Sequence, residues 1–308
     1  MLKYITKRLL ITIPVLLLMV FLIFLMLNVV AGDPVTIMMG ERIKPDVIET
    51  LRESMHLDDP FIVRFLRYVW DALHGDLGTS YKLKRSVSGL IAGAFPTTCR
   101  LAVSAALFSW ILGIPIGILS AVKKNSFADR FFMGFSLFGV SMPVFWIGLI
   151  LQNLFKNVLP ISGFSTWQHM ILPTIVLGWQ SSGTISRLTR SSLLEVMRND
   201  YIRTARAKGL PGLLVITRHA FKNAIIPVIT MMAIQLSSLL SGAVITETIF
   251  SIPGIGRLSV DAISQRDMPL LQGTVIFTAI LIIGGNLVAD VLYSVVDPRI
   301  RVDGGGGK

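Results

Sequence analysis

Six long stretches of this 308-residue sequence contain no Asp, Glu, Lys or Arg, and each is rich in Leu, Ile, Val, Phe or Met. A helix needs about 20 such residues to cross the hydrocarbon core of a bilayer. The fourth stretch has only 17 residues and spans fully only if Trp167 anchors one interface and Arg187 reaches the other. The stretches are Leu9–Ala31, Leu101–Val122, Phe131–Phe155, Met170–Ser186, Ala224–Thr246 and Met268–Ala289.

The composition supports an all-α integral membrane protein with six transmembrane helices. Hydrophobic residues make up 53% of the chain and charged residues 15%, against about 25% charged residues in soluble domains. This composition argues against a water-soluble globule. A net charge of +11 is typical of proteins that bind nucleic acid or an anionic membrane, and the positions of the basic residues decide between these two partners.

The basic residues predict the orientation of the chain. Six spans place both termini on one side, and 17 of the 29 Lys and Arg residues fall on that side, eight of them between residues 187 and 222. The positive-inside rule makes this side cytoplasmic. The first apolar stretch, at 23 residues, exceeds the apolar core of a cleavable signal peptide, so we expect it to be retained. The +11 is thus an orientation signal and no sign of nucleic-acid binding.

Two segments outside the spans show helical patterns. Residues 61–73 carry apolar side chains at helical spacing, so we expect an amphipathic helix on the outer membrane face or against the spans. Asp59 is predicted to cap it, Pro60 to take its first position and Gly75 to end it. In the cytoplasmic stretch 191–223, Asp200 is predicted to cap a helix Tyr201–Lys208, Gly209 to supply a left-handed C-cap, and Pro211 to start a second short helix. Such a pair forms a rigid elbow.

Residue patterns for enzymatic chemistry are missing from the sequence. It contains no Gly-x-x-x-x-Gly-Lys-Ser/Thr loop for a nucleotide phosphate and no Gly-x-Ser-x-Gly nucleophile turn. The four histidines lie far apart, and the single cysteine, Cys99, excludes an internal disulfide and a Cys-based zinc site. We therefore expect no catalytic, cofactor or metal residues on this chain, which makes it a transport subunit whose energy comes from another chain.

Several separated motifs resemble the permeases of binding-protein-dependent ABC importers, in the dipeptide/oligopeptide/nickel branch. The cytoplasmic segment 199–209, with 223–227 after it, resembles the signature loop of that family. In place of the Glu-Ala-Ala that opens the general signature, this chain has Arg203-Thr204-Ala205, as expected of the peptide/nickel branch. The other matching motifs are Ala31-Gly32-Asp33-Pro34, Gly75-Asp76-Leu77-Gly78-Thr79-Ser80, Phe95-Pro96-Thr97-Thr98, Glu247 to Arg257, and Asp297-Pro298-Arg299-Ile300-Arg301.

The resemblance implies a type I (MetI-like) permease fold and a set of partners. The chain would pair with a second homologous permease, two ABC ATPases would bind below and hold the ATP and Mg, and a solute-binding protein would dock outside. The implied location is the cytoplasmic membrane of a prokaryote. The expected domains are the N-terminal tail and first span (1–31), an extracytoplasmic segment (32–96), the core permease domain (97–301) and a flexible tail (302–308).

The resemblance also implies residue roles. The elbow would couple to an ATPase through Tyr201, Arg203, Thr204, Ala205, Arg206, Ala207, Lys208 and Gly209. Polar residues inside the spans are candidates for the translocation pathway, because polar groups facing lipid are costly: Ser141, Gln180, Gln235 and Ser238. The segment with Pro253-Gly254-Ile255-Gly256 cannot continue a helix, so we expect an outer gate or binding-protein contact formed by Glu247, Pro253, Gly254, Gly256 and Arg257.

The sequence leaves the substrate open. Peptides are the leading expectation, and nickel or another metal chelate is the alternative within the family. An ATPase-independent membrane channel or scaffold is the alternative from a different class, and the elbow argues against it. Selection of the solute is expected to occur first in the binding protein, so this chain does not reveal it.

Overall fold

The described part of the chain is helical. The computed structural model describes residues 2–30, 52 and 58–296, and within them the sole strand-like pairing is an isolated bridge between Thr79 and Ser86. The main helices are α1 (Leu2–Val30), α4 (Phe61–Leu73), α5 (Val87–Val122), α6 (Phe127–Ser141), α7 (Val144–Phe155), α8 (Ile171–Val196), α9 (Asp200–Ala207), α11 (Phe221–Leu240), α12 (Val244–Ile249), α13 (Ile255–Ser264) and α14 (Met268–Val296). The all-α prediction is confirmed.

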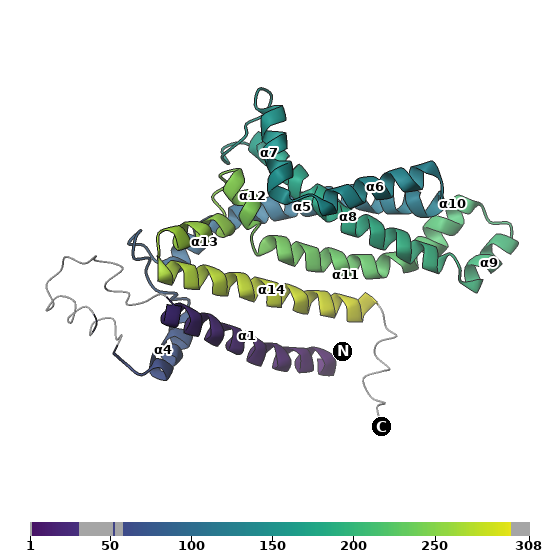
Figure 1. Cartoon of the computed structure of the whole chain (residues 1–308). Coiled ribbons are helices and arrows are strands. Elements are labelled where there is room, and N and C mark those ends of the chain that lie inside the picture. Colours follow the sequence, from purple (N-terminus) through teal and green to yellow (C-terminus); the bar gives the residue numbers. More distant parts are fainter. Residues whose placement is uncertain (1, 31–51, 53–57, 297–308) are drawn as a thin grey trace.

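The long helices run roughly along one direction and form an elongated bundle (Figure 1). Helix α1 contacts α14, α14 contacts α11, α11 contacts both α5 and α8, and α5 and α6 both pack against α8. Helices α12 and α13 lie at one end of the bundle, which we call the α13 end, and α9 lies at the other, the α9 end. The first residues of α1 and the last of α14 both lie toward the α9 end.

Small residues allow the central helices to approach closely. Gly117 of α5 packs so tightly that an added Cβ would lie 2.6 Å from the carbonyl oxygen of Ser186 in α8. Gly183 of α8 likewise has the Ser136 carbonyl of α6 against it. The Ser186 hydroxyl donates to the Ser136 hydroxyl at 2.8 Å, so polar groups between the helices are bonded to one another. Close backbone approach and interhelical hydrogen bonds are how helices associate in lipid, where burial of apolar side chains gives no net driving force.

The expected third span is broken in two. Helix α6 ends at Ser141, α7 begins after Pro143, and the two helix axes differ in direction by 103°. Pro143 has no amide hydrogen, so the chain turns where the helical ladder would need one. The charge-free stretch Phe131–Phe155, expected from the sequence as a single span, is thus divided between two helices.

The other expected spans correspond to helices of different lengths. Among the described residues, α5, the continuous helix Gly212–Leu240 and α14 are long and apolar enough to cross a membrane, and α6 with α7 would make a fourth if counted as one span. In α1 the stretch Leu10–Met26 is a shorter apolar helix. Helix α8 has 26 residues, longer than the expected 17-residue stretch, but Arg187 and Arg190 lower its apolar character. Six spans therefore remain a prediction.

The expected amphipathic helix forms, with different ends. Helix α4 covers Phe61–Leu73, and its aromatic residues pack edge-on against Phe21 and Phe24 of α1. Pro60 occupies the N-cap position rather than the first helical position. Asp59 does not cap the helix and instead forms an ion pair with Arg67 at 2.8 Å. Gly75, just after the helix, has the positive φ of +85° expected of a terminating glycine.

Candidate functional site

The signature segment forms a short helix at the α9 end. Helix α9 begins at Asp200 and ends at Ala207, one residue earlier at each end than expected. Asn199 is the N-cap residue, so the prediction that Asp200 caps the helix is wrong: Asp200 already has helical geometry. Gly209 has a φ of +73°, which confirms the predicted left-handed turn after the helix. The chain therefore reverses direction sharply at this glycine.

One face of α9 packs against its own chain. Ile202 and Ala205 are buried in a cluster with Leu193 of α8 and with Val215 and Ala220, which precede α11. Ala205, expected to contact an ATPase, thus helps to hold α9 in place. In addition, the side-chain amide of Asn223 in α11 donates to the Tyr201 hydroxyl of α9 at 2.9 Å.

The other face of α9 is exposed and basic. Arg203, Arg206 and Lys208 all point away from the cluster, and the one acidic residue of the helix, Asp200, lies 3.5 Å from Arg203. The remaining expected coupling residues Tyr201, Thr204, Ala207 and Gly209 are also exposed. Leu213, which the sequence analysis missed, adds an apolar side chain that is 76% exposed just after the turn. Helix α9 and the turn as far as Leu213 therefore form a knob, the α9 knob, with a basic helix face and an apolar tip.

The second half of the elbow is not a separate helix, contrary to the sequence prediction. After Pro211 the chain forms one helical turn (Gly212–Leu214), a π-helical turn (Val215–Ala220) and then α11 without interruption. Together they make a helix of 29 residues. Helix α9 is therefore joined by a short turn to this long helix, which includes α11. The sequence did not reveal this because Arg218 and Lys222 interrupt the apolar pattern before Ala224.

At the α13 end, Glu247 is the centre of a buried hydrogen-bond cluster. Its side chain is 0% exposed. One carboxylate oxygen accepts a hydrogen bond from the Thr98 hydroxyl of α5 at 2.9 Å, and the other accepts from the Arg257 backbone amide at 3.0 Å. The Gly256 amide donates to the carboxylate as well, and Thr98 in turn accepts from the Ile255 amide at 2.9 Å. Burial raises the pKa of the Glu247 carboxyl, and these donors partly oppose the shift.

Two glycines make room for this carboxylate. A Cβ at residue 254 would lie 2.5 Å from the Glu247 carboxylate, and one at residue 256 would lie 2.7 Å from the Val244 Cα. The motif Pro253-Gly254-Ile255-Gly256 is therefore a tight connection folded around Glu247.

The two helices joined by this connection, α12 and α13, form a hairpin pinned to α5. Glu247, Gly254 and Gly256 hold it from inside, whereas Pro253 is exposed and Arg257 is partly exposed, 3.9 Å from Asp261. The accessible surface of the motif is thus Pro253 and Arg257.

The expected pathway residues lie on three helices. Gln235 of α11 is bonded to α5: its side-chain oxygen accepts from the Ser109 hydroxyl and from the Trp110 indole, both at 3.2 Å. Gln180 of α8 is half-buried. Ser141, the last residue of α6, and Ser238 of α11 are exposed. Gln235 therefore joins helices, and Ser141 and Ser238 are the members of the set that are open to a partner or a solute.

Two polar clusters escaped the sequence analysis. Asp267, before α14, accepts hydrogen bonds from the hydroxyl of Ser80 at 2.5 Å and from the amides of Tyr81 and Lys82 at 3.2 Å each. This fixes the Gly-Asp-Leu-Gly-Thr-Ser segment to the α13–α14 turn, and burial raises the pKa of Tyr81 to about 12. Partners so far apart in the sequence leave no local signal.

The second cluster is an ion pair near the α9 end. Asp129 of α6 and Arg190 of α8 form a bidentate pair with two contacts of 2.8 Å. The backbone amide of Asn125, in the turn before α6, donates to the same carboxylate at 2.8 Å. The pair fixes the start of α6 to α8.

The class of protein follows from a family comparison that covers most of the chain. Residues 113–302 match the family described as binding-protein-dependent transport system inner membrane component, and residues 1–102 match its N-terminal family. The chain belongs to this family of inner-membrane permeases.

More specific relatives place it in the dipeptide/oligopeptide type. It is 42% identical to the dipeptide transport system permease protein DppB of Escherichia coli strain K12, over 98% of this chain and 99% of the relative. It is 41% identical to the glutathione transport system permease protein GsiC of Salmonella paratyphi A, with the same coverage. The resemblance drawn from the sequence motifs is confirmed.

Solved structures show the same fold at lower identity. A chain of the MetNI methionine ABC transporter, in an inward-facing conformation, superposes with a TM-score of 0.59 at 16% identity, covering 68% of this chain and 96% of that one. A chain of an amino acid ABC transporter with histidines superposes with a TM-score of 0.53, covering 69% of this chain and 94% of that one. The MetI-like fold class is confirmed. The motifs at 31–34 and 297–301 lie outside the described residues.

Proposed function

We propose that this chain is one of two transmembrane subunits of an importer for short peptides in the cytoplasmic membrane. It pairs with a second homologous permease, receives its solute from an extracytoplasmic binding protein, and is driven by two ABC ATPases that hold ATP and Mg. The α9 end faces the cytoplasm, the α13 end faces outside, and both termini are cytoplasmic. Dipeptides and glutathione, the solutes in the names of the relatives, are both short peptides, and they support peptides over a metal ion.

The observation that carries the proposal is the construction of the α9 knob. Its inner face is fixed by Ile202 and Ala205, its outer face presents Arg203 and Arg206, and the chain leaves it through the 29-residue helix that includes α11. Closure of the ATPases would move α9, and the continuous helix would carry the displacement to the opposite end as a rigid-body movement. A plain cytoplasmic loop would need neither the buried face nor the continuous helix.

The test uses the left-handed turn at Gly209. A Cβ there meets no atom within 4 Å, so the cost of a side chain comes from φ alone. The left-handed conformation costs an ordinary residue about 1–2 kcal/mol and a β-branched residue more, whereas Asn tolerates it. We expect Gly209→Val to lower uptake and solute-stimulated ATPase activity in proteoliposomes while the four-subunit complex still copurifies, and Gly209→Asn to retain both activities.

Gly212 supplies the matched control, since it lies three residues away, also has open space around its Cα, and has no positive φ. We expect Gly212→Ala to behave as the parent does. Unchanged coupling in Gly209→Val would contradict the role of the elbow. Ion conductance by this chain without ATPases would support a channel instead. Calorimetry of the solute-binding protein with dipeptides, glutathione and Ni²⁺ tests the solute class separately.

A further inference from the structure

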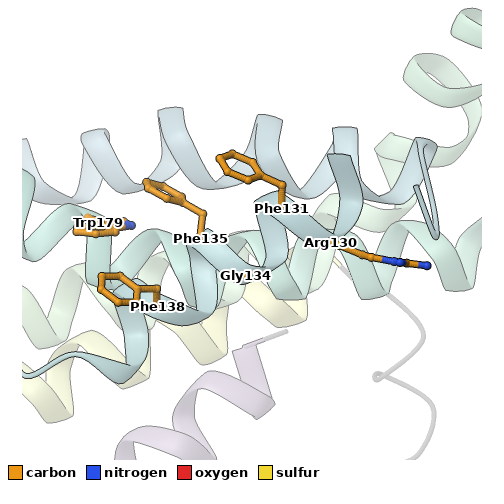
Figure 2. Close-up of a pocket in the computed structure, with 6 residues that line it drawn as sticks. All are labelled: Arg130, Phe131, Gly134, Phe135, Phe138 and Trp179. Carbon is orange, nitrogen blue, oxygen red and sulfur yellow. The ribbon is translucent and has the colours of Figure 1, made fainter. Parts of the chain in front are cut away.

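An apolar groove runs along α6 toward the α9 end. It has a volume of about 460 Å³ and is lined by Arg130, Phe131, Gly134, Phe135 and Phe138 of α6 and by Trp179 of α8 (Figure 2). Phe135 stacks on Trp179 with ring centroids 5.0 Å apart, and Phe138 lies 5.8 Å from the same ring. Between the rings, a Cβ at Gly134 would meet no atom within 4 Å, so the groove is open there. From Arg130 to Phe138 it extends about 12 Å along the helix.

The exposed surface of α6 is that of a helix facing lipid. Apart from Arg130, which is exposed in the first turn, the polar residues of α6 before its last turn point inward: Ser136 is buried against Ser186 of α8, and Asp129 is buried against Arg190. A water-filled pathway would be lined by polar groups, because it must solvate a peptide, so this face does not fit one. The large exposed side chains beyond the first turn are all apolar: Phe131, Phe135, Leu137 and Phe138.

The groove also differs from a helix–helix contact. Transmembrane helices associate through small residues that let their backbones approach, and α6 uses such residues on its inner side. Gly139 lies under the Trp179 ring, and Ser136 lies against Gly183. The groove instead presents large aromatic rings with open space between them, which suits a flexible apolar chain.

The mouth of the groove is positively charged. Arg130 is exposed at the mouth itself, and Lys123 and Lys124 are exposed on the turn that precedes α6. Arg187 is exposed on α8, where it follows Trp179 and Gly183 at intervals of four residues along one helix face. Asp129, the acidic residue of this region, is already paired with Arg190, whose guanidinium group donates to both carboxylate oxygens. The charge of the mouth therefore matches an anionic group.

We propose that this groove binds an anionic phospholipid, with an acyl chain along the aromatic residues and the phosphate beside Arg130. Basic residues attract anionic headgroups near the membrane surface, and apolar side chains replace the contacts that the acyl chain makes in the bilayer. The assignment to the cytoplasmic leaflet rests on the orientation proposed above. The groove itself does not depend on transport, so lipid binding is tested without it.

The experiment measures contact between lipid and Trp179 in the assembled four-subunit complex in nanodiscs. Phosphatidylglycerol or phosphatidylcholine with brominated acyl chains is included over the same range of mole fractions, and tryptophan emission is measured for the parent and for Trp179→Phe. The emission of the parent minus that of the variant is the contribution of Trp179. We expect brominated phosphatidylglycerol to quench this emission at lower mole fraction than brominated phosphatidylcholine. Replacement of one basic residue, Arg130→Gln, should weaken the preference about fivefold.

Two further variants separate lipid binding from a general change. Gly134→Leu places a side chain in the groove at a position where a Cβ meets no atom within 4 Å, and it should reduce quenching by both lipids. Lys208→Gln removes an exposed positive charge from α9, outside the groove, and should leave the preference unchanged. Equal quenching by the two lipids would overturn the proposal, since no headgroup would be selected. Absence of quenching by either lipid would also overturn it and would show that protein, such as the second permease, covers the groove.

Discussion

Removal of the Glu247 carboxylate is expected to release the α12–α13 hairpin. In Glu247→Ala, the amides of Gly256 and Arg257 lose their buried acceptor. A buried donor left without a partner costs about 1–3 kcal/mol, so these two amides alone cost roughly 2–6 kcal/mol. Thr98→Val removes one donor to the carboxylate and strands the Ile255 amide, which donates to the Thr98 hydroxyl, at a cost of about 1–3 kcal/mol.

The assay is thermal denaturation of the purified transporter complex, together with ATPase activity stimulated by the loaded binding protein. We expect Glu247→Ala to lower the midpoint most, Thr98→Val to lower it less, and the double variant to lose less than the sum, because the two residues share a hydrogen bond. Thr248→Val is the matched control: it makes the same chemical change on α12, where the Thr248 hydroxyl is exposed. Equal midpoints for Thr98→Val and Thr248→Val, or a parent-like Glu247→Ala, would refute the cluster as the anchor of the hairpin.

Three other contacts give predictions that the same denaturation assay checks. Gly183→Ala should destabilise the complex by forcing α6 and α8 apart, whereas Gly93→Ala in the open part of α5 should not; equal effects would contradict tight packing at Gly183. Asp129→Asn should destabilise the complex by less than the about 3–5 kcal/mol of a fully buried pair, because the Arg190 side chain is 26% exposed, and Asp129→Asn combined with Arg190→Met should recover part of the loss; no recovery would argue against the pair. Ser80→Ala should cost about 1–3 kcal/mol and increase proteolysis of the segment before α5, and parent-like protection would show that the bond to Asp267 does not hold it.

The elements with a local signal were predicted from the sequence. The helix at 61–73 follows from the spacing of its apolar residues, and the turn at Gly209 follows from a glycine after a short polar helix. Boundaries were less exact, since both Asp59 and Asp200 were expected to cap helices and neither does. A capping side chain competes with other partners: Asp59 pairs with Arg67, and Asp200 lies near Arg203.

The roles expected for the candidate sites stay predictions, and the structure adds the contacts of their side chains. Residues 247–257 were expected to form an outer gate or a binding-protein contact, but their sequence does not show that the Glu247 side chain points inward to Thr98, 149 positions earlier in the chain. Gln235 was expected in the pathway, and its bonds to Ser109 and Trp110 also join residues more than a hundred positions apart. Contacts across such distances depend on how helices are placed, which no window of sequence contains.

The sequence by itself determined that the chain is a helical membrane permease, because apolar stretches, glycine turns and family motifs act over a few residues. The tertiary structure decided where α6 and α7 break, that the residues from Gly212 to Leu240 form one continuous helix, and which face of α9 is buried. It also set the anionic cluster at Glu247 and the cationic mouth beside Arg130. These features arise when helices distant in sequence pack, because only then does each polar group find or lack its partner.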